Sequence, residues 1–420
     1  MTVTATAVQA GEEREPAFIS RFGKLVAVLR SATLTSNQRL VLTKLAVVLG
    51  LAAGFALSPK LWVTARFYPL VPVPLHGLPR IPFPLDYICF GVLWLLLALI
   101  AISGRPRIYI AAFVALLLFL AVLDQTRWQP WVYLYLFMLI PFAGYSGRAN
   151  DLRGQENLLN ICRLIVGCTY FYSGLQKMNS HFAVNGFPTL LGPLASHLPM
   201  LHLWGWVVAA IEASIGIGLL TRKYRNLAVM VGVSMHCFIL YTCTVVLDWN
   251  SVVWPWNVAM IAFLFTLFWK ADFSFGDVVW RNGLAYQKIV LLLFGVLPFF
   301  SFFGWWDSYL SASLYSANVP LANVFVGDTV KDELPERVRR YTHKLYGNTT
   351  IVKIQDWSLG ELNVPPYAAA RVYRSIGADL CRYSHNSPEV VLMIQEKNTL
   401  FGNGLLYRYT CFNGLAFDLR

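Results

Sequence analysis

The sequence predicts a mainly α-helical membrane protein, in which a polytopic bundle of about nine transmembrane spans is followed by a small C-terminal α+β domain outside the membrane. Of the 420 residues, 57% are hydrophobic and only 13% are charged, so the composition is far more apolar than that of soluble domains. Long apolar segments recur up to residue 306, and charged residues become frequent after it. The chain is therefore expected to be embedded in a membrane by its first three quarters.

Each span is expected where an apolar segment approaches the roughly 20 residues that cross a bilayer as a helix. Nine such segments, some of them shorter than that, lie near residues 43–58, 86–104, 107–123, 130–145, 157–176, 200–220, 226–247, 252–269 and 287–306. Residues 1–16 have no basic start followed by an apolar core, so they do not resemble a cleavable signal peptide. The first span is expected to direct membrane insertion.

Three regions are expected along the chain. Residues 1–42 form a cytoplasmic arm, in which residues 17–31 place apolar side chains on one helical face among basic ones, as in helices that lie on a membrane surface. Residues 43–306 form the transmembrane bundle. Residues 307–420 form the outer domain, periplasmic or extracellular, with strands expected at 349–355 and 390–397 and a helix at 367–383.

The distribution of basic residues predicts a cytoplasmic N-terminus. With this orientation the inner loops contain Arg105, Arg107, Arg148, Arg153, Arg222, Lys223, Arg225, Lys270, Arg281 and Lys288, and the outer loops contain Lys60, Arg66, Arg80, Arg127 and Lys177. Inner loops of membrane proteins are enriched in Lys and Arg. An odd number of spans then places the segment after Trp306 outside. The net charge of +12 indicates contact with membrane lipids, and no basic and aromatic cluster indicates nucleic acid.

The cysteines and motifs exclude several kinds of chemistry. Five cysteines lie in expected spans, and only Cys381 and Cys411 could form a disulfide, provided that the outside is oxidising. The sequence has no metal-ligand spacing such as CxxC or HExxH, no glycine-rich phosphate loop and no GxSxG motif. No metal is expected.

A group of polar and aromatic residues is expected at the outer ends of the spans, where it could bind a substrate. Its members are Asp124, Arg127, Trp128, Trp131, Lys177, His181, Asp248, Asn250, Trp254, Trp256 and Asn257. An aromatic belt at the membrane surface would account for the tryptophans, but it accounts less well for the charged and amide side chains among them.

Three ionisable residues lie deeper in the expected spans: Arg163, Glu212 and His236. Each costs on the order of 2.5–3.5 kcal/mol to insert, so such residues face the interior of a bundle and pair. Two interpretations remain open. Glu212 could form a structural ion pair with His236 or Arg163, or the three residues could form a proton relay.

Lys177 ends the fifth span. A lysine at the end of a span commonly extends its charged group to the membrane surface. However, one stripe of the helix carries Arg163, Tyr170, Ser173 or Gly174, and Lys177. Lys177 could therefore point into the bundle instead.

Four segments resemble a known family in the same order along the chain. They are DQTRWQPWVYLY (124–135), RLIVGCTYFYSGLQKMNSHF (163–182), IEASIG (211–216) and SMHCF (234–238). Together they are similar to segments of the vitamin K-dependent gamma-glutamyl carboxylases. Over residues 85–270 the chain looks like a bacterial member of the wider horizontally transferred transmembrane domain (HTTM) superfamily, which implies a bacterial inner membrane.

The resemblance implies a role for Lys177 as the catalytic base that activates a reduced naphthoquinone of the vitamin K or menaquinol type. The chain would then be a lyase that couples quinol oxygenation to carboxylation of a peptide or small molecule at the outer face. Two positions differ from the family pattern, which has a lysine at Gln176 and a histidine at Trp131. Two alternatives to this enzyme remain: a quinone- or lipid-binding membrane component without carboxylation, and a transporter with a path lined by Arg163, Glu212 and His236.

Overall fold

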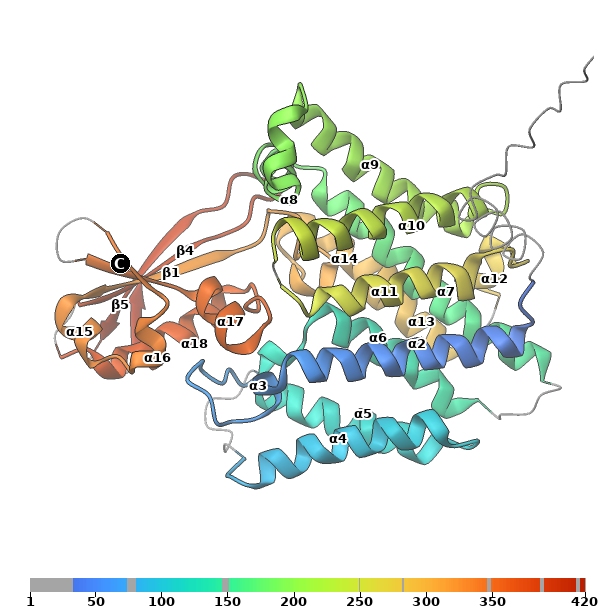
Figure 1. The fold of residues 1–420 in the computed structure, drawn as a ribbon, viewed down its shortest axis with the longest axis horizontal. Coiled ribbons are helices and arrows are strands. Elements are labelled where there is room, and N and C mark those ends of the chain that lie inside the picture. The colour runs from blue at the N-terminus through green and yellow to red at the C-terminus, as the bar shows by residue number, and fades with distance from the viewer. Residues whose placement is uncertain are drawn as a thin grey trace, which may run out of the picture. The chain divides into compact units, whose positions relative to one another are not determined.

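The computed structural model describes residues 33–73, 81–145, 151–248, 250–281, 283–345, 349–385, 389–412 and 416–419. The surface helix expected at residues 17–31 lies outside the described residues. Residues from Ser36 onward form one compact unit, which contains a helical bundle and a C-terminal sheet domain (Figure 1).

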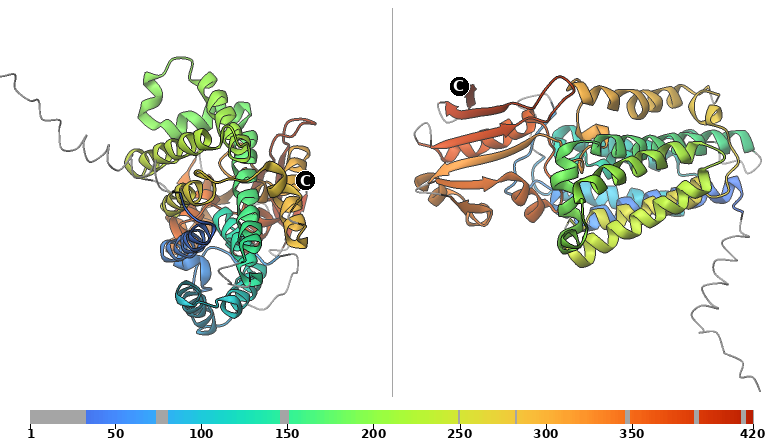
Figure 2. Two further views of the ribbon diagram at one scale, coloured as in Figure 1. Left: turned by 90° about the vertical axis from the view of Figure 1, so that its right-hand side faces the viewer. Right: turned by 90° about the horizontal axis from the view of Figure 1, so that it is seen from above.

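The bundle is built from apolar helices that lie side by side, as the end-on view in Figure 2 shows. Its helices are α2 (Ser36–Leu57), α3 (Pro59–Trp62), α4 (Leu85–Ile102), α5 (Arg107–Leu123), α6 (Pro130–Gly144), α7 (Leu152–Lys177), α8 (Phe187–Leu191), α9 (Leu201–Leu220), α10 (Arg225–Tyr241), α11 (Val253–Phe263), α12 (Phe275–Val279), α13 (Ala285–Val290) and α14 (Leu297–Phe300). Large apolar side chains such as Leu95 and Ile217 are exposed on the outer helix surfaces. Lipid contact explains this exposure, because soluble proteins rarely expose so much apolar surface to water.

The chain is an integral membrane protein. Six helical segments are long and apolar enough to cross a bilayer: Ser36–Leu57, Leu85–Ile102, Leu152–Lys177, Leu201–Leu220, Arg225–Val246 and Ala285–Phe303. Three further apolar helices, Arg107–Leu123, Pro130–Gly144 and Val253–Phe268, are shorter. The mainly helical membrane fold is confirmed, and the expected count of about nine spans is not.

Hydrogen bonds between chain segments define the two ends of the bundle. At one end, Arg39 donates to the carbonyl oxygen of Thr266 at 2.9 Å. At the other end, Asn363 of the C-terminal domain donates to the carbonyl oxygen of Leu57 at 2.8 Å, and Gln129 donates to that of Pro365 at 3.2 Å. The sheet domain therefore lies against the end of the bundle at which α2 finishes (Figures 1 and 2).

The C-terminal domain contains a six-stranded antiparallel sheet of order β2-β3-β1-β4-β5-β6. Its strands are β1 (Leu321–Gly327), β2 (Thr342–Lys344), β3 (Thr349–Lys353), β4 (Val390–Gln395), β5 (Leu406–Phe412) and β6 (Ala416–Leu419). The helices α17 (Ile354–Leu362) and α18 (Ala370–Leu380) pack against it. Alternation along β1 buries Val324 and Val326, as expected for a strand with one covered face. The strands and the helix expected at 349–355, 390–397 and 367–383 are confirmed.

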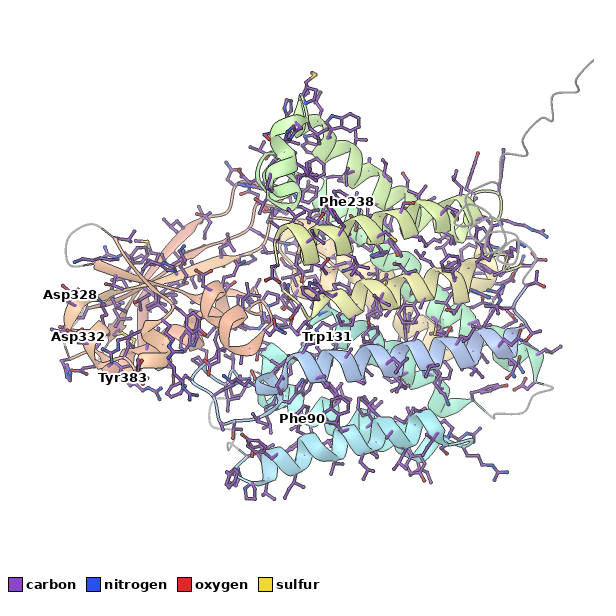
Figure 3. All side chains as sticks on the ribbon, in the orientation of Figure 1. Phe90, Trp131, Phe238, Asp328, Asp332 and Tyr383 are labelled. Atoms are coloured by element: carbon purple, nitrogen blue, oxygen red, sulfur yellow. A yellow bond between two sulfur atoms is a disulfide. The ribbon has the colours of Figure 1, made fainter. Side chains whose placement is uncertain are left out.

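Two further features complete the domain. Cys381, directly after α18, and Cys411 in β5 form a disulfide with an S–S distance of 2.00 Å. The short helices α15 (Asp328–Glu333) and α16 (Glu336–Arg339) follow β1. Figure 3 shows Asp328, Asp332 and Tyr383 in the domain away from the bundle, whereas Trp131 lies within the bundle.

Candidate functional site

Helices α7 and α9 approach each other closely because glycines line their contact. A Cβ atom on Gly174 would collide with the backbone of Ala213, and one on Gly216 would collide with the backbone of Phe171. Small residues allow two membrane helices to pack backbone against backbone. This approach brings the C-terminal end of α7 within reach of side chains on α9.

Lys177 and Glu212 form a buried ion pair across this contact. The ammonium of Lys177 donates to both carboxylate oxygens of Glu212 at 2.8 Å and to Oγ of Ser173 at 2.7 Å. The two charged side chains are only 13% and 10% exposed. Because a lysine ammonium has three donors, all of its N–H bonds have partners in the bundle. Lys177 thus points inward, and its charge is held by α9.

A second chain of hydrogen bonds begins one helical turn before Ser173. The hydroxyl of Tyr170 lies 2.5 Å from Nε2 of His236, and Nδ1 of His236 lies 2.7 Å from Oδ1 of Asn257. The amide of Asn257 is oriented by its Nδ2, which donates to the carbonyl oxygen of Val253 at 2.8 Å. Oδ1 must then accept from Nδ1 of His236, so Nε2 of a neutral His236 accepts a hydrogen bond from the hydroxyl of Tyr170.

These two sets of contacts form what we call the α7 network. Its members are Tyr170, Ser173, Lys177, Glu212, His236 and Asn257. They come from α7, α9, α10 and α11, and Tyr170, Glu212, His236 and Asn257 are each less than 9% exposed. Buried polar groups in membranes are costly unless they are paired, and here the pairing links four helices.

Arg163 lies on α7 as well but belongs to a different cluster. It donates to Glu156 at 2.8 Å, to Oδ1 of Asn160 at 2.7 Å and to the carbonyl oxygen of Leu267 at 2.9 Å. Glu212 therefore pairs with Lys177 rather than with Arg163 or His236. The stripe expected on α7 is present, but its two ends serve separate sites.

Asp124 and Arg127 form a structural cluster at the end of the bundle that faces the C-terminal domain. The carboxylate of Asp124 accepts from Arg66 at 2.5 Å and from the hydroxyl of Thr126 at 2.7 Å. Arg127 donates to the backbone oxygens of Leu61 and Leu120. These groups tie the proline-rich segment after α3 to the end of α5, and the carboxylate of Asp124 lies within 3.8 Å of both guanidinium groups.

The remaining predicted residues do not join one site. Trp131 is buried beside Gly54 and Phe55, while Trp128, Trp254 and Trp256 are half-buried. Asp248 is exposed. The other two contact the C-terminal part of the chain: His181 lies 2.8 Å from Nδ2 of Asn398, and Asn250 donates to the hydroxyl of Tyr315 at 2.9 Å.

Sequence reasoning missed several partners in these clusters. The sequence places Arg66 only in an outer loop and Ser173 only on the α7 stripe, and it indicates no role for Glu156. Lys397 and Arg371 of the C-terminal domain were not singled out at all. These residues pair with residues far away along the chain. The only signals in the sequence were a basic residue in a proline-rich stretch, Arg66, and a lysine next to the end of a strand, Lys397. Among the described residues, no group of three or more His, Cys, Asp or Glu side chains could hold a metal ion.

Fold and site together define a helical integral membrane protein with an ionisable network buried between four helices. Residues 155–253, roughly a quarter of the chain, match the family model of the methylamine utilisation protein MauE. Searches of curated proteins and of solved structures found no match. The matched segment runs from the start of α7 to the beginning of α11.

This match corrects the resemblance to the gamma-glutamyl carboxylases and the HTTM superfamily, which was wrong, together with the carboxylase and lyase activity that it implied. The geometry gives a physical reason. A general base needs a free lone pair, whereas Lys177 uses its three N–H donors on Ser173 and Glu212. The reduced naphthoquinone and the outer-face peptide or small-molecule substrate stay predictions.

Proposed function

We propose that this chain is a membrane component of methylamine utilisation and that the α7 network is its working centre. One observation carries the proposal. The segment similar to MauE contains five of the six network residues: Tyr170, Ser173, Lys177, Glu212 and His236. The sixth, Asn257, follows the segment by four positions.

The chemistry that the network supports is the holding and passing of a proton inside the membrane. Buried carboxylates and histidines in spans commonly serve as proton relays. Tyr170 donates a hydrogen bond to Nε2 of a neutral His236, and Lys177 neutralises the carboxylate of Glu212. A proton accepted at His236 would give the centre one net positive charge, and the carboxylate of Glu212 would lower the cost of holding that charge inside the bundle.

The proposed setting is a bacterial inner membrane, with the N-terminus in the cytoplasm and the C-terminal domain outside. The excess of Lys and Arg in the loops assigned to the cytoplasm supports this orientation. The disulfide between Cys381 and Cys411 supports it as well, because disulfides persist in oxidising compartments outside the cytoplasm.

The proposal is tested by complementation. A methylamine-utilising bacterium that lacks its own MauE should grow on methylamine when it expresses this chain. Glu212→Gln and Lys177→Met should each abolish that growth while the protein remains in the membrane, as a blot of the membrane fraction would check. Growth at the parental rate with both variants would exclude the network as the working centre.

The matched control is Glu336→Gln, which removes one partner of an exposed ion pair with Arg340 in the C-terminal domain. It should grow like the unaltered chain. If the unaltered chain reaches the membrane at the level of the MauE that it replaces and still gives no growth on methylamine, the proposed function is overturned.

A further inference from the structure

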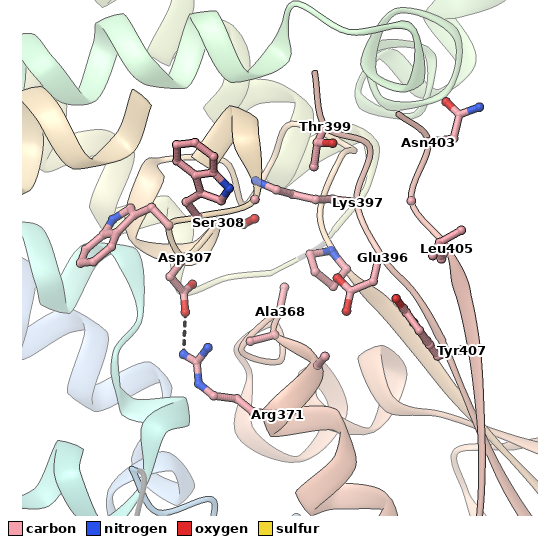
Figure 4. Close-up of a pocket in the computed structure, with 17 residues that line it drawn as sticks. Asp307, Ser308, Ala368, Arg371, Glu396, Lys397, Thr399, Asn403, Leu405 and Tyr407 are labelled. Carbon is pink, nitrogen blue, oxygen red and sulfur yellow. Dashed lines mark hydrogen bonds and ion pairs between the residues drawn. The ribbon is translucent and has the colours of Figure 1, made fainter. Parts of the chain in front are cut away.

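A second polar site, which shares no residue with the α7 network, lies at the junction between the bundle and the C-terminal domain. An open cavity of about 480 Å³ lies between residues 304–308, which follow the last span, and the ends of β4 and β5. This volume is within the roughly 300–1,000 Å³ that is typical of small-ligand sites. Figure 4 shows four charged side chains around it: Asp307, Arg371, Glu396 and Lys397.

The four charges are of both signs, and their pairing differs. Arg371 donates to Asp307 at 2.5 Å, so these two neutralise each other. Lys397 donates to the backbone oxygen and, at 2.7 Å, to the hydroxyl of Ser301. No hydrogen bond joins the half-buried carboxylate of Glu396 to any side chain in the described part of the domain. Burial raises the pKa of Glu396 and lowers that of Lys397 to about 8.

The donor set suits a ligand that carries both a phosphate and an ammonium. A lysine ammonium has three donors and a guanidinium has five, so Lys397 and Arg371 keep N–H groups for a phosphate. The carboxylate of Glu396 can accept from an ammonium. A purely anionic ligand fits less well, since Asp307 and Glu396 would repel it.

An apolar cluster next to the cavity adjoins the end of the span Ala285–Phe303. Trp305 and Phe401 are 68% and 71% exposed, and their ring centroids are 6.2 Å apart. Phe303, the last residue of the span Ala285–Phe303, packs against both rings. The loop that carries Phe401 is attached to the span by a hydrogen bond from the backbone N–H of Leu400 to the oxygen of Phe302 at 2.9 Å. Exposed aromatic rings at the end of a span are typical of the lipid headgroup level.

We propose that this cavity binds the headgroup of an ethanolamine phospholipid from the leaflet next to the C-terminal domain. Lys397 and Arg371 contact the phosphate, Glu396 contacts the ammonium, and the acyl chains leave along Phe303, Trp305 and Phe401. The inference does not depend on the MauE-like segment, because none of these residues lies within it.

The test uses the full chain, purified and stripped of lipid, with bound lipid counted by native mass spectrometry. Short-chain phosphatidylethanolamine, phosphatidylcholine and phosphatidylglycerol are titrated in parallel with free phosphoethanolamine. We expect the ethanolamine lipid to bind roughly tenfold more tightly than the other two lipids, the ratio that one charge-assisted hydrogen bond gives. Equal binding of the three lipids would overturn the proposal. If free phosphoethanolamine binds as tightly as the lipid, the ligand need not come from the membrane, and the proposal of a phospholipid ligand is overturned.

Three variants separate the contacts. Glu396→Gln should reduce the preference for ethanolamine over choline, and Lys397→Met should weaken all phosphate-containing ligands. Phe401→Ser changes an exposed side chain, so folding should be retained while lipid binding falls and phosphoethanolamine binding does not. The control Arg340→Gln removes one partner of an exposed ion pair in the same domain, and this variant should bind the lipids like the unaltered chain. Unchanged ethanolamine preference in Glu396→Gln, together with unchanged lipid binding in Lys397→Met and Phe401→Ser, would exclude this cavity.

Discussion

Lys177 is the residue that joins α7 to α9 through its ammonium group. In water a lysine at a helix end is solvated, but here its three donors meet Ser173 and the two oxygens of Glu212. Each partner compensates the desolvation of the other. Replacing only one of the two residues with an uncharged one should therefore destabilise the protein, because the other charge stays buried without a partner.

This coupling gives a prediction for single and double variants. Glu212→Ala should lower the free energy of unfolding by about 3–5 kcal/mol, because it leaves the ammonium of Lys177 buried without its counter-charge. The double variant Lys177→Met/Glu212→Met should recover most of the loss. Unfolding of the detergent-solubilised protein by SDS would measure both. Glu336→Ala, in an exposed pair, should cost at most about 1 kcal/mol, and an equal cost at Glu212 would mean that Glu212 faces water.

Lys397 gives a prediction of pH dependence. Its pKa in the folded protein is about 8, lowered from 10.5 by burial. Between these values the unfolded chain binds more protons than the folded protein, so the contribution of Lys397 to stability rises with pH from about 8 to 10.5 and is constant below that range.

The measurement compares the lipid-free protein with Lys397→Met. The melting temperature of the unaltered protein minus that of the variant should increase as the pH is raised from roughly 7.5 to roughly 10, because the pKa values of Lys397 in the folded and unfolded states span this range. A difference that stays constant over this interval would show that the ammonium is not buried in the folded protein, and one that falls would show that the fold raises the pKa of Lys397.

At the scale of helices, the contact between α7 and α9 positions the network. Each helix contributes one glycine at a point where its backbone meets that of the other. The ion pair of Lys177 and Glu212 lies beside the contact of Gly174 with Ala213, and its atoms are 2.8 Å apart. Close packing of the two helices and the ion pair are therefore expected to support each other.

Substitution of the contact glycine should therefore separate the helices. Gly174→Ala should destabilise the protein by about 1–3 kcal/mol, because the new methyl group meets backbone atoms that cannot rotate away. Gly91→Ala is the matched control: it lies in α4 with open space around its Cβ position. There alanine should be neutral or stabilise the helix by up to about 1 kcal/mol. Equal melting temperatures for the two variants would contradict the close contact.

At the scale of the whole molecule, the number of membrane crossings decides the side on which the C-terminal domain lies. Nine crossings place the two termini on opposite sides, whereas the six helices that satisfy length and hydropathy alone would place them on the same side. The hydrogen bonds that join Asn363 to Leu57 and Gln129 to Pro365 attach the domain to the end at which α2 finishes, which supports an odd number.

A fusion after Arg420 tests this arrangement. A reporter enzyme that is active only outside the cytoplasm should be active there, because loops rich in Lys and Arg remain in the cytoplasm. A reporter that is active only in the cytoplasm should be silent at the same position. The reverse result would place the disulfide-bonded domain inside and would remove the proposed orientation.

The sequence by itself determined the membrane class, the position of most apolar helices and the strands β3 and β4, because composition and periodicity are local properties. It also located Lys177, Glu212 and His236 as polar residues within spans. Only the tertiary structure decided their partners. Glu212 meets Lys177 because two glycines let α7 and α9 approach, and Asp124 meets Arg66 because the segment after α3 folds back over the end of α5. Such pairings depend on helix rotation and separation, which no short stretch of sequence encodes. For that reason four short motifs in the same order suggested a carboxylase, whereas the ion pair of Lys177 does not support one.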